Sequence, residues 1–232
     1  MTRLRLLAVF EILVCSGLPT QLAIAGGLAV IGIRPYDAHR ALAANYVFAV
    51  SLLDAVVLVG LITWFLRLHG ERPGEVLLGA RPIWREALRG VLQIPLVFLI
   101  VVVVMLTVQH FFPWLHNVAK NPFEGMIRTA ADAAKFTVVA VVGGGVREEV
   151  QRAFILHRFE QCLGGKYVGL AISSLAFGLG HFIQGRDVAV ATATLGAFWG
   201  WMYLRRGSIG STVVSHSGFN VAEIFRYTFY GA

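Results

Sequence analysis

The chain has 232 residues, of which 57% are hydrophobic and only 14% are charged, and its mean hydropathy is +0.70. An ordinary soluble domain has about 45–50% apolar and about 25% charged residues, so the composition excludes a soluble fold and predicts a membrane protein. The net charge of +7 comes from basic residues in short stretches between apolar runs. Such stretches orient a chain in a bilayer. The sequence contains no contiguous basic-aromatic patch, so we do not expect a nucleic-acid partner.

Apolar stretches predict seven membrane-spanning helices, or eight if one long run is broken. The run 90–112, for example, supplies roughly the 20 apolar residues that cross about 30 Å of hydrocarbon. In chain order, the predicted spans cover residues 5–33, 42–67, 90–112, 129–163, 166–183, 187–205 and 209–230.

The first predicted span begins like a signal peptide, with basic residues, an apolar run and "AIA" at 23–25. However, Glu11 interrupts the apolar run, and hydrophobicity continues beyond the possible cleavage site. We therefore expect this segment to be retained as a span, with a kink near Pro19.

With the N-terminus inside, the predicted inner segments hold 13 of the 20 Lys and Arg residues. The outer segments hold six, namely Arg34, Arg40, Lys120, Arg128, Arg186 and Arg226. The positive-inside rule therefore predicts a cytoplasmic N-terminus, and seven spans put the C-terminus outside. The longest polar connection, 68–89, contains Trp84 and Leu88, which suggests an amphipathic segment on the cytoplasmic interface or a plain loop.

Ionisable side chains in apolar spans are candidate functional residues, because each costs about 2.5–3.5 kcal/mol even on the lenient insertion scale. Glu11 and Asp54 are solitary in their spans. This favours pairing with another helix, or a water-facing structural role, over catalysis.

The C-terminal half differs, because three segments bring polar groups at helical spacing. In "REEVQR", Arg152 follows Glu148 by four residues and Glu149 by three, so it can pair with one carboxylate and leave the other free. The alternative is a salt-bridged helix end. In "FGLGH", His181 closes an apolar run, where a packed histidine is the alternative.

The third segment is "HSGFN" in the last span. His216 and Asn220 are four residues apart, so an imidazole and an amide face the same way, although helix-to-helix hydrogen bonding would also explain them. A carboxylate pair, one histidine and a histidine with an asparagine supply what peptide hydrolysis needs. A general base activates water, and donors stabilise the oxyanion.

These motifs resemble those of the CPBP family (CAAX protease and bacteriocin-processing, or Abi), intramembrane endopeptidases related to the CAAX prenyl endopeptidase. The resemblance covers residues 140–225 and implies an all-α, polytopic membrane helix bundle with a polar intramembrane active-site cavity. We expect one protease domain over 1–232. By this resemblance, Glu148 and His181 polarise water, His216 and Asn220 stabilise the oxyanion, and Glu149 and Arg152 orient the base.

The first motif departs from the family spacing, because two residues instead of three separate the glutamate pair from Arg152. Aligned on the glutamates, Glu148 is the base and Glu149 is the alternative. Aligned on Arg152, Arg147 would take the position of the base.

Metal dependence and substrate stay open. Glu148, His181 and His216 are ligand types that zinc accepts, but no HExxH motif occurs, and the resemblance also fits a metal-free, glutamate-activated water. The substrate would be a CAAX-like C-terminus, a bacteriocin-type peptide or a membrane protein. The family has compact bacterial members, so the resemblance implies that the protein lies in a bacterial-type inner (plasma) membrane.

Two rival functions remain. A rhomboid-like serine protease would need a serine in a Gly-x-Ser-Gly setting, which the chain lacks. A non-catalytic scaffold or a transporter would use the same charges to line a polar cavity.

Overall fold

The computed structural model describes residues 2–36, 42–118, 124–127 and 129–230. Three basic residues expected on the outer side, Arg40, Lys120 and Arg128, lie outside the described residues. Within these ranges the chain forms helices and one isolated bridge between Tyr36 and Leu42, and it forms no strand. The all-α prediction is confirmed for this part of the chain.

The helices follow the predicted stretches closely. They are α1 Thr2–Val14, α2 Leu18–Val30, α3 Ala44–Leu68, α4 Pro73–Leu77, α5 Ile83–Phe111, η1 Pro113–Leu115, η2 Glu124–Met126, α6 Ala130–Val139, η3 Ala140–Arg147, α7 Glu148–Cys162, α8 Lys166–Gly180, η4 Phe182–Gln184, α9 Arg186–Arg206 and α10 Gly210–Tyr230.

Among the described helices, α3 and α5 are long and apolar enough to cross a membrane. The pair α1 and α2, bent by 45°, is a third candidate if it counts as one span, and α8 is apolar but shorter. Together with the composition, this indicates an integral membrane protein. The predicted number of seven or eight spans is not confirmed, because α7, α9 and α10 carry charged and polar side chains among their apolar ones.

The bend between α1 and α2 lies at Gly17, whose φ of 91° is a left-handed conformation that glycine adopts readily. Pro19 follows in the first turn of α2, where its missing N–H leaves no hydrogen bond unmade. The predicted kink near Pro19 is therefore confirmed.

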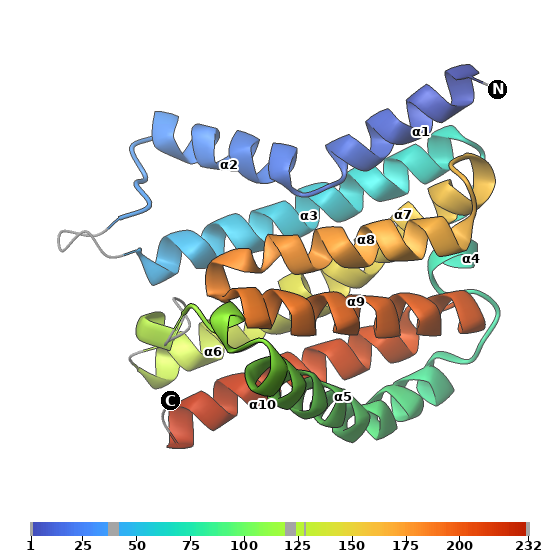
Figure 1. Ribbon diagram of the computed structural model, residues 1–232. Coiled ribbons are helices and arrows are strands. Elements are labelled where there is room, and N and C mark those ends of the chain that lie inside the picture. Colours follow the sequence, from blue (N-terminus) through green and yellow to red (C-terminus); the bar gives the residue numbers. More distant parts are fainter. Residues whose placement is uncertain (1, 37–41, 119–123, 128, 231–232) are drawn as a thin grey trace.

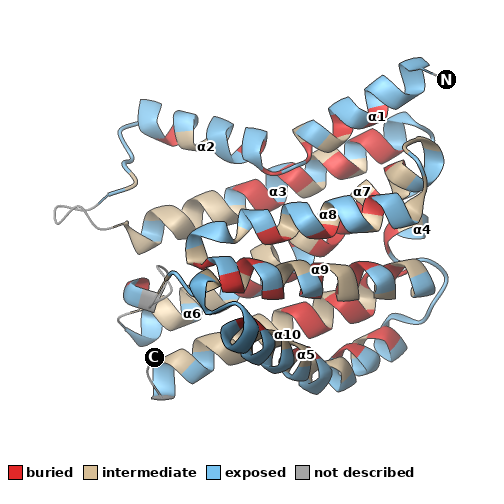
Figure 2. Ribbon diagram, viewed as in Figure 1, coloured by how far each residue is buried: buried red, intermediate tan, exposed pale blue. Residues whose placement is uncertain are grey.

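The helices are arranged as a bundle, with α1 and α2 along one side and α5 and α10 along the opposite side (Figure 1). The first residues of α1, the start of α5, the turn between α7 and α8 and the end of α9 lie at one end of this bundle (Figure 1). Helix α7 contacts α1, α3, α8 and α9, so the motif-bearing helix is central although it carries several charges. Buried positions gather on α3, α7, α9 and α10, whereas α5 is largely exposed (Figure 2).

The stretch predicted at 129–163 is a continuous helical run that changes from an α-helix to a π-helix and back to an α-helix. Thr129 and Asp132 form a capping box at the start of α6, and η3 is a π-helix that ends directly before Glu148. Short π-helical segments are frequent at functional sites. A Cβ atom on Gly144 or Gly145 would collide with side chains of α10, so these glycines allow η3 and α10 to approach closely.

The connection 68–89 is neither a plain loop nor a separate interfacial helix. It contains the short helix α4, and its last residues form the first two turns of α5. Trp84 and Leu88 are exposed on these turns.

Candidate active site

Three side chains from α7 and α10 form a buried cluster. Glu149 and Arg152 are 1% and 5% exposed, and Arg152 Nη1 donates a hydrogen bond to Glu149 Oε1. His216 Nδ1 lies 2.9 Å from the same carboxylate oxygen. The arginine thus pairs with the second glutamate of the motif, three residues before it, and the pair holds the histidine of the last helix.

Glu148 approaches the same histidine from the other side. Its carboxylate Oε2 lies 3.7 Å from His216 Nε2, and its side chain is 21% exposed. When Nδ1 carries the proton that is donated to Glu149, Nε2 of the neutral ring is an acceptor that faces Glu148. The two adjacent glutamates therefore contact opposite nitrogens of one imidazole, and only Glu148 is partly accessible.

Aromatic rings enclose the cluster. The Trp199 ring is stacked on the His216 ring, with centroids 3.8 Å apart, and its Nε1–H donates to Ser215 Oγ at 3.1 Å. The Arg152 guanidinium lies 4.6 Å from the centroid of the Phe177 ring. Trp199 is not predictable as a site residue from the sequence, because a tryptophan in an apolar helix is the ordinary pattern of core packing.

His181 reaches the cluster through Phe177. The Phe177 ring lies edge-on to both histidines, with centroids 4.8 Å from His181 and 6.0 Å from His216. His181 Nδ1 is 2.8 Å from the Phe177 carbonyl oxygen, which leaves Nε2 as the available ring nitrogen. Within the described residues, His181 makes no hydrogen bond or ion pair with Glu148.

Asn220 lies one helical turn after His216, on the face of α10 that packs against η3. Its side-chain nitrogen occupies the space that a Cβ atom on Gly144 would need, one turn before Glu148. The structure thus places Glu148, Glu149, Arg152 and His216 in direct contact, and His181 and Asn220 at their flanks.

The tentative zinc ligands do not form a cluster in the described part of the chain, where no three His, Cys, Asp or Glu side chains lie close enough to hold a metal ion. Glu149 and His216 are instead engaged with each other, and Arg152 shares the same carboxylate oxygen. The zinc set of Glu148, His181 and His216 stays a prediction.

The two solitary carboxylates of the first half are paired. Asp54 is buried, accepts a hydrogen bond from Thr20, and lies 2.7 Å from Arg147 Nη2. The Arg147 guanidinium fills the space beside Gly17 at the bend between α1 and α2. This arginine therefore joins the end of η3 to the first half of the bundle. Such a structural role fits the alignment in which Glu148, and not Arg147, takes the position of the catalytic base.

Glu11 belongs to a second cluster, built around the buried Arg158. Arg158 Nε donates to Glu11 at 2.7 Å and Nη1 donates to Glu71 at 2.7 Å, while His69 lies 2.6 Å from the other oxygen of Glu11. His157 lies 2.6 Å from Glu71. The cluster connects α1, the turn after α3 and α7, so both solitary carboxylates pair with other helices, as we expected.

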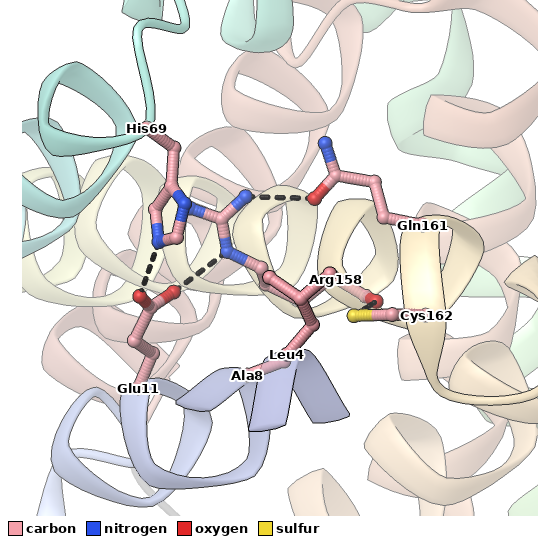
Figure 3. A pocket seen from close by; sticks show the side chains of 7 residues that line it. All are labelled: Leu4, Ala8, Glu11, His69, Arg158, Gln161 and Cys162. Carbon is pink, nitrogen blue, oxygen red and sulfur yellow. Dashed lines mark hydrogen bonds and ion pairs between the residues drawn. The ribbon is translucent and has the colours of Figure 1, made fainter. Parts of the chain in front are cut away.

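A cavity of about 270 Å³ borders the Arg158 cluster, between α1 and α7 (Figure 3). A second, apolar cavity of about 420 Å³ lies at the bend of α1 and α2. Neither cavity is lined by a candidate catalytic residue, so the predicted polar cavity at the active site stays a prediction.

Glu71 lies outside the membrane-spanning segments, in the turn after α3. Its partial burial acts to raise the pKa of the carboxyl, but the hydrogen bonds from Arg158, His157 and Gln161 and the charge of Arg158 have the larger combined effect. They hold the pKa of Glu71 below its ordinary value of 4.5.

The fold and this geometry define a helical membrane protein with a glutamate–histidine site between α7 and α10. Residues 130–222 match the family model described as type II CAAX prenyl endopeptidase Rce1-like, a segment that covers less than half of the chain and contains every candidate site residue. The match confirms the resemblance of this segment to the CAAX-protease family and indicates an intramembrane CAAX-type endopeptidase. No curated protein and no solved structure matches the chain.

Proposed function

We propose that the protein is an intramembrane endopeptidase in which Glu148, held beside His216, activates a water that hydrolyses a peptide bond near the membrane. The observation that carries the proposal is the pair of contacts on His216. Glu149 binds Nδ1 at 2.9 Å, and Glu148 lies 3.7 Å from Nε2. A positioned carboxylate beside an oriented imidazole is an arrangement suited to general acid–base catalysis.

Glu148 is the general base in this mechanism, because its carboxylate is partly exposed and adjoins the imidazole. It takes a proton from water as the water oxygen attacks the carbonyl carbon of the substrate. The tetrahedral intermediate then breaks its C–N bond, and Glu148 returns the proton to the leaving amine. Glu149 stays ionised against Arg152 and fixes the orientation of the His216 ring.

Asn220 stabilises the oxyanion through its side-chain N–H groups, and His216 contributes when its Nε2 carries a proton, since both residues lie on the face of α10 that meets the start of α7. Hydrogen-bond donors aimed at the developing charge contribute about 2.7–4 kcal/mol each to such reactions. His181, across the Phe177 ring, polarises the water or the carbonyl from the side of α8. Substrate binding has to bring Nε2 of His181 into reach, because Phe177 now separates the two imidazoles.

We propose the glutamyl form of the reaction, supported by the position of the Phe177 ring between His181 and His216, which keeps the tentative zinc ligands apart in the described residues. Peptide cleavage by the purified protein should continue in the presence of a zinc chelator, within about twofold of the untreated rate. Loss of cleavage with chelator, and its recovery with added zinc, would instead assign Glu148, His181 and His216 as metal ligands.

The proposed substrate is a CAAX-like C-terminus, a bacteriocin-type peptide or a membrane protein that reaches the site from the bilayer. The proposed location is a bacterial-type inner membrane, with a cytoplasmic N-terminus. A comparison of membrane-protein fragments from cells with the wild type and with Glu148→Ala tests the proposal directly. Fragments that disappear in the variant identify substrates, whereas identical fragments in both would favour a non-catalytic scaffold or a transporter.

A further inference from the structure

The start of α5 and the end of α9 are joined at one end of the bundle (Figure 1). Arg81 Nε donates to the Arg206 carbonyl oxygen at 2.8 Å, and the Arg206 guanidinium binds the buried Glu86 carboxylate, with Nε 2.6 Å from Oε2. Two segments more than 100 residues apart are thus joined at this end of the bundle. The exposed basic and aromatic side chains of the two joined segments, here the basic–aromatic patch, are Arg81, Trp84, Arg85, Arg89, Trp201 and Arg205.

The patch carries an excess of positive charge. Residues 78–89 and 200–207 contain a single acidic residue, Glu86, which is 1% exposed and bound to Arg206, with Arg89 Nη1 3.8 Å away. The other arginines of the patch therefore face solvent without an acidic side chain from these segments to balance them. This patch is assembled by the fold, which explains why no contiguous one is visible in the sequence.

The aromatic rings of the patch support its arginines. The Arg85 guanidinium lies 5.0 Å from the centroid of the Trp84 ring, and the Arg205 guanidinium lies 5.1 Å from that of Trp201. Tryptophans concentrate at the level of the lipid headgroups, where the ring is half in hydrocarbon and half in water. The patch thus combines the charge and the aromatic side chains of a membrane interface.

An apolar stripe continues from the patch along α5. Leu88, Leu92, Leu96 and Leu99 are all exposed, and their spacing of three or four residues places them on one face of the helix with Arg85. From Arg85 to Leu99 this face extends about 21 Å at 1.5 Å per residue. Helix α5 is exposed along most of this length (Figure 2).

We propose that the basic–aromatic patch binds the headgroup of an anionic phospholipid, whose acyl chains lie along the leucine stripe of α5. Clusters of four or more arginines at the end of a membrane span attract anionic lipids. A nucleic acid or an acidic peptide would match the charge, but it would leave the adjoining apolar stripe uncovered. The leucine stripe therefore favours a lipid over these polar ligands.

The test measures lipid binding to the full chain in detergent and needs no peptidase activity. Native mass spectrometry gives the affinity for a short-chain phosphatidylglycerol and for the matching phosphatidylcholine. The wild type should prefer phosphatidylglycerol at least tenfold. Arg85→Gln/Arg89→Gln/Arg205→Gln should lose that preference, because each arginine near the surface contributes about fivefold, or about 1 kcal/mol.

The matched control removes three exposed arginines elsewhere, in Arg34→Gln/Arg186→Gln/Arg226→Gln, and should keep the preference for phosphatidylglycerol. The preference should also fall as salt is raised, since the Debye length shrinks from about 10 Å at 0.1 M to about 3 Å at 1 M. Equal affinity of the wild type for both lipids would overturn the proposal. So would an equal loss in both triple variants, or tighter binding of RNA than of phosphatidylglycerol at this patch.

Discussion

Two buried arginines of α7, Arg152 and Arg158, lie six residues apart and have different surroundings. Arg158 binds two carboxylates from other segments, and all four oxygens of Glu11 and Glu71 have partners. Arg152 binds Glu149 alone and otherwise faces aromatic rings, and in the described structure Glu149 Oε2 has no hydrogen-bond partner.

We infer from this difference that the Arg158 cluster is structural and that the Arg152 cluster is the reactive one in the proposed mechanism. The carboxylates around Arg158 are satisfied and connect three segments, so their removal should affect stability. The cluster around Arg152 keeps an unpaired carboxylate oxygen, a histidine held through one nitrogen and a partly exposed second glutamate beside it. Such a cluster can exchange protons and contact a substrate, so its alteration should affect catalysis first.

The largest effect on activity, after that of the base itself, is expected from Glu149→Gln. The amide no longer neutralises Arg152 and no longer fixes the His216 ring as a charged acceptor, so cleavage should fall by roughly 100-fold, within the range of general acid–base contributions. The rate of peptide cleavage across pH is the measurement, because a role in orienting His216 changes the shape of the profile. An unchanged rate and profile would remove Glu149 from the site.

A large effect on stability is expected from Arg158→Met. This change leaves Glu11 buried without its charged partner, which typically costs about 3–5 kcal/mol. Thermal unfolding in detergent should occur at a much lower temperature, while the cleavage rate per folded molecule stays within about twofold of the wild type.

The double variant Glu11→Gln/Arg158→Met is the control for this experiment, since it removes both charges and should recover part of the lost stability. A variant Arg158→Met that is stable but inactive would reverse the comparison and place the Arg158 cluster at the reactive centre.

The smallest effect is expected on the pH dependence of stability, through Glu71 of the Arg158 cluster. Because the folded protein holds the pKa of Glu71 below its ordinary value of 4.5, the carboxylate stabilises the fold above that pH. The contribution is lost as pH falls through the lowered pKa. Thermal unfolding measured at pH 7 and at several pH values below 4.5 should show that the wild type loses stability more steeply than Glu71→Gln as the pH falls. The exposed Glu75→Gln should behave as the wild type, and parallel curves for all three proteins would contradict this account.

Periodicity and composition predicted the helices well because both are local properties. The predicted stretches coincide with the observed helices to within a few residues in most cases, and Gly17 and Pro19 explain the bend of the first pair. The number of membrane crossings could not be fixed in this way. Length and hydropathy identify α3 and α5 in the described residues, but several other helices mix apolar and charged positions.

Contacts between side chains of different helices were harder to predict from the sequence. The spacing of Glu148, Glu149 and Arg152 predicted that one carboxylate would pair with the arginine, but either glutamate satisfied that pattern. The choice of Glu149 depends on the position of His216, 67 residues later in the sequence. The stacking of Trp199 on this histidine likewise depends on how α9 packs against α10, and no local pattern reports it.

The central claim is that Glu148 acts as the catalytic base, and the most direct measurement is the cleavage rate of a reporter peptide by purified Glu148→Gln. Its control is Glu160→Gln, since Glu160 is exposed on the same helix and pairs only with Lys166 in the described structure. We predict that Glu148→Gln loses at least about 100-fold in rate, as removal of a general base does, with unchanged thermal unfolding, and that Glu160→Gln keeps the wild-type rate. A folded Glu148→Gln variant that cleaves the peptide at the wild-type rate would contradict the account.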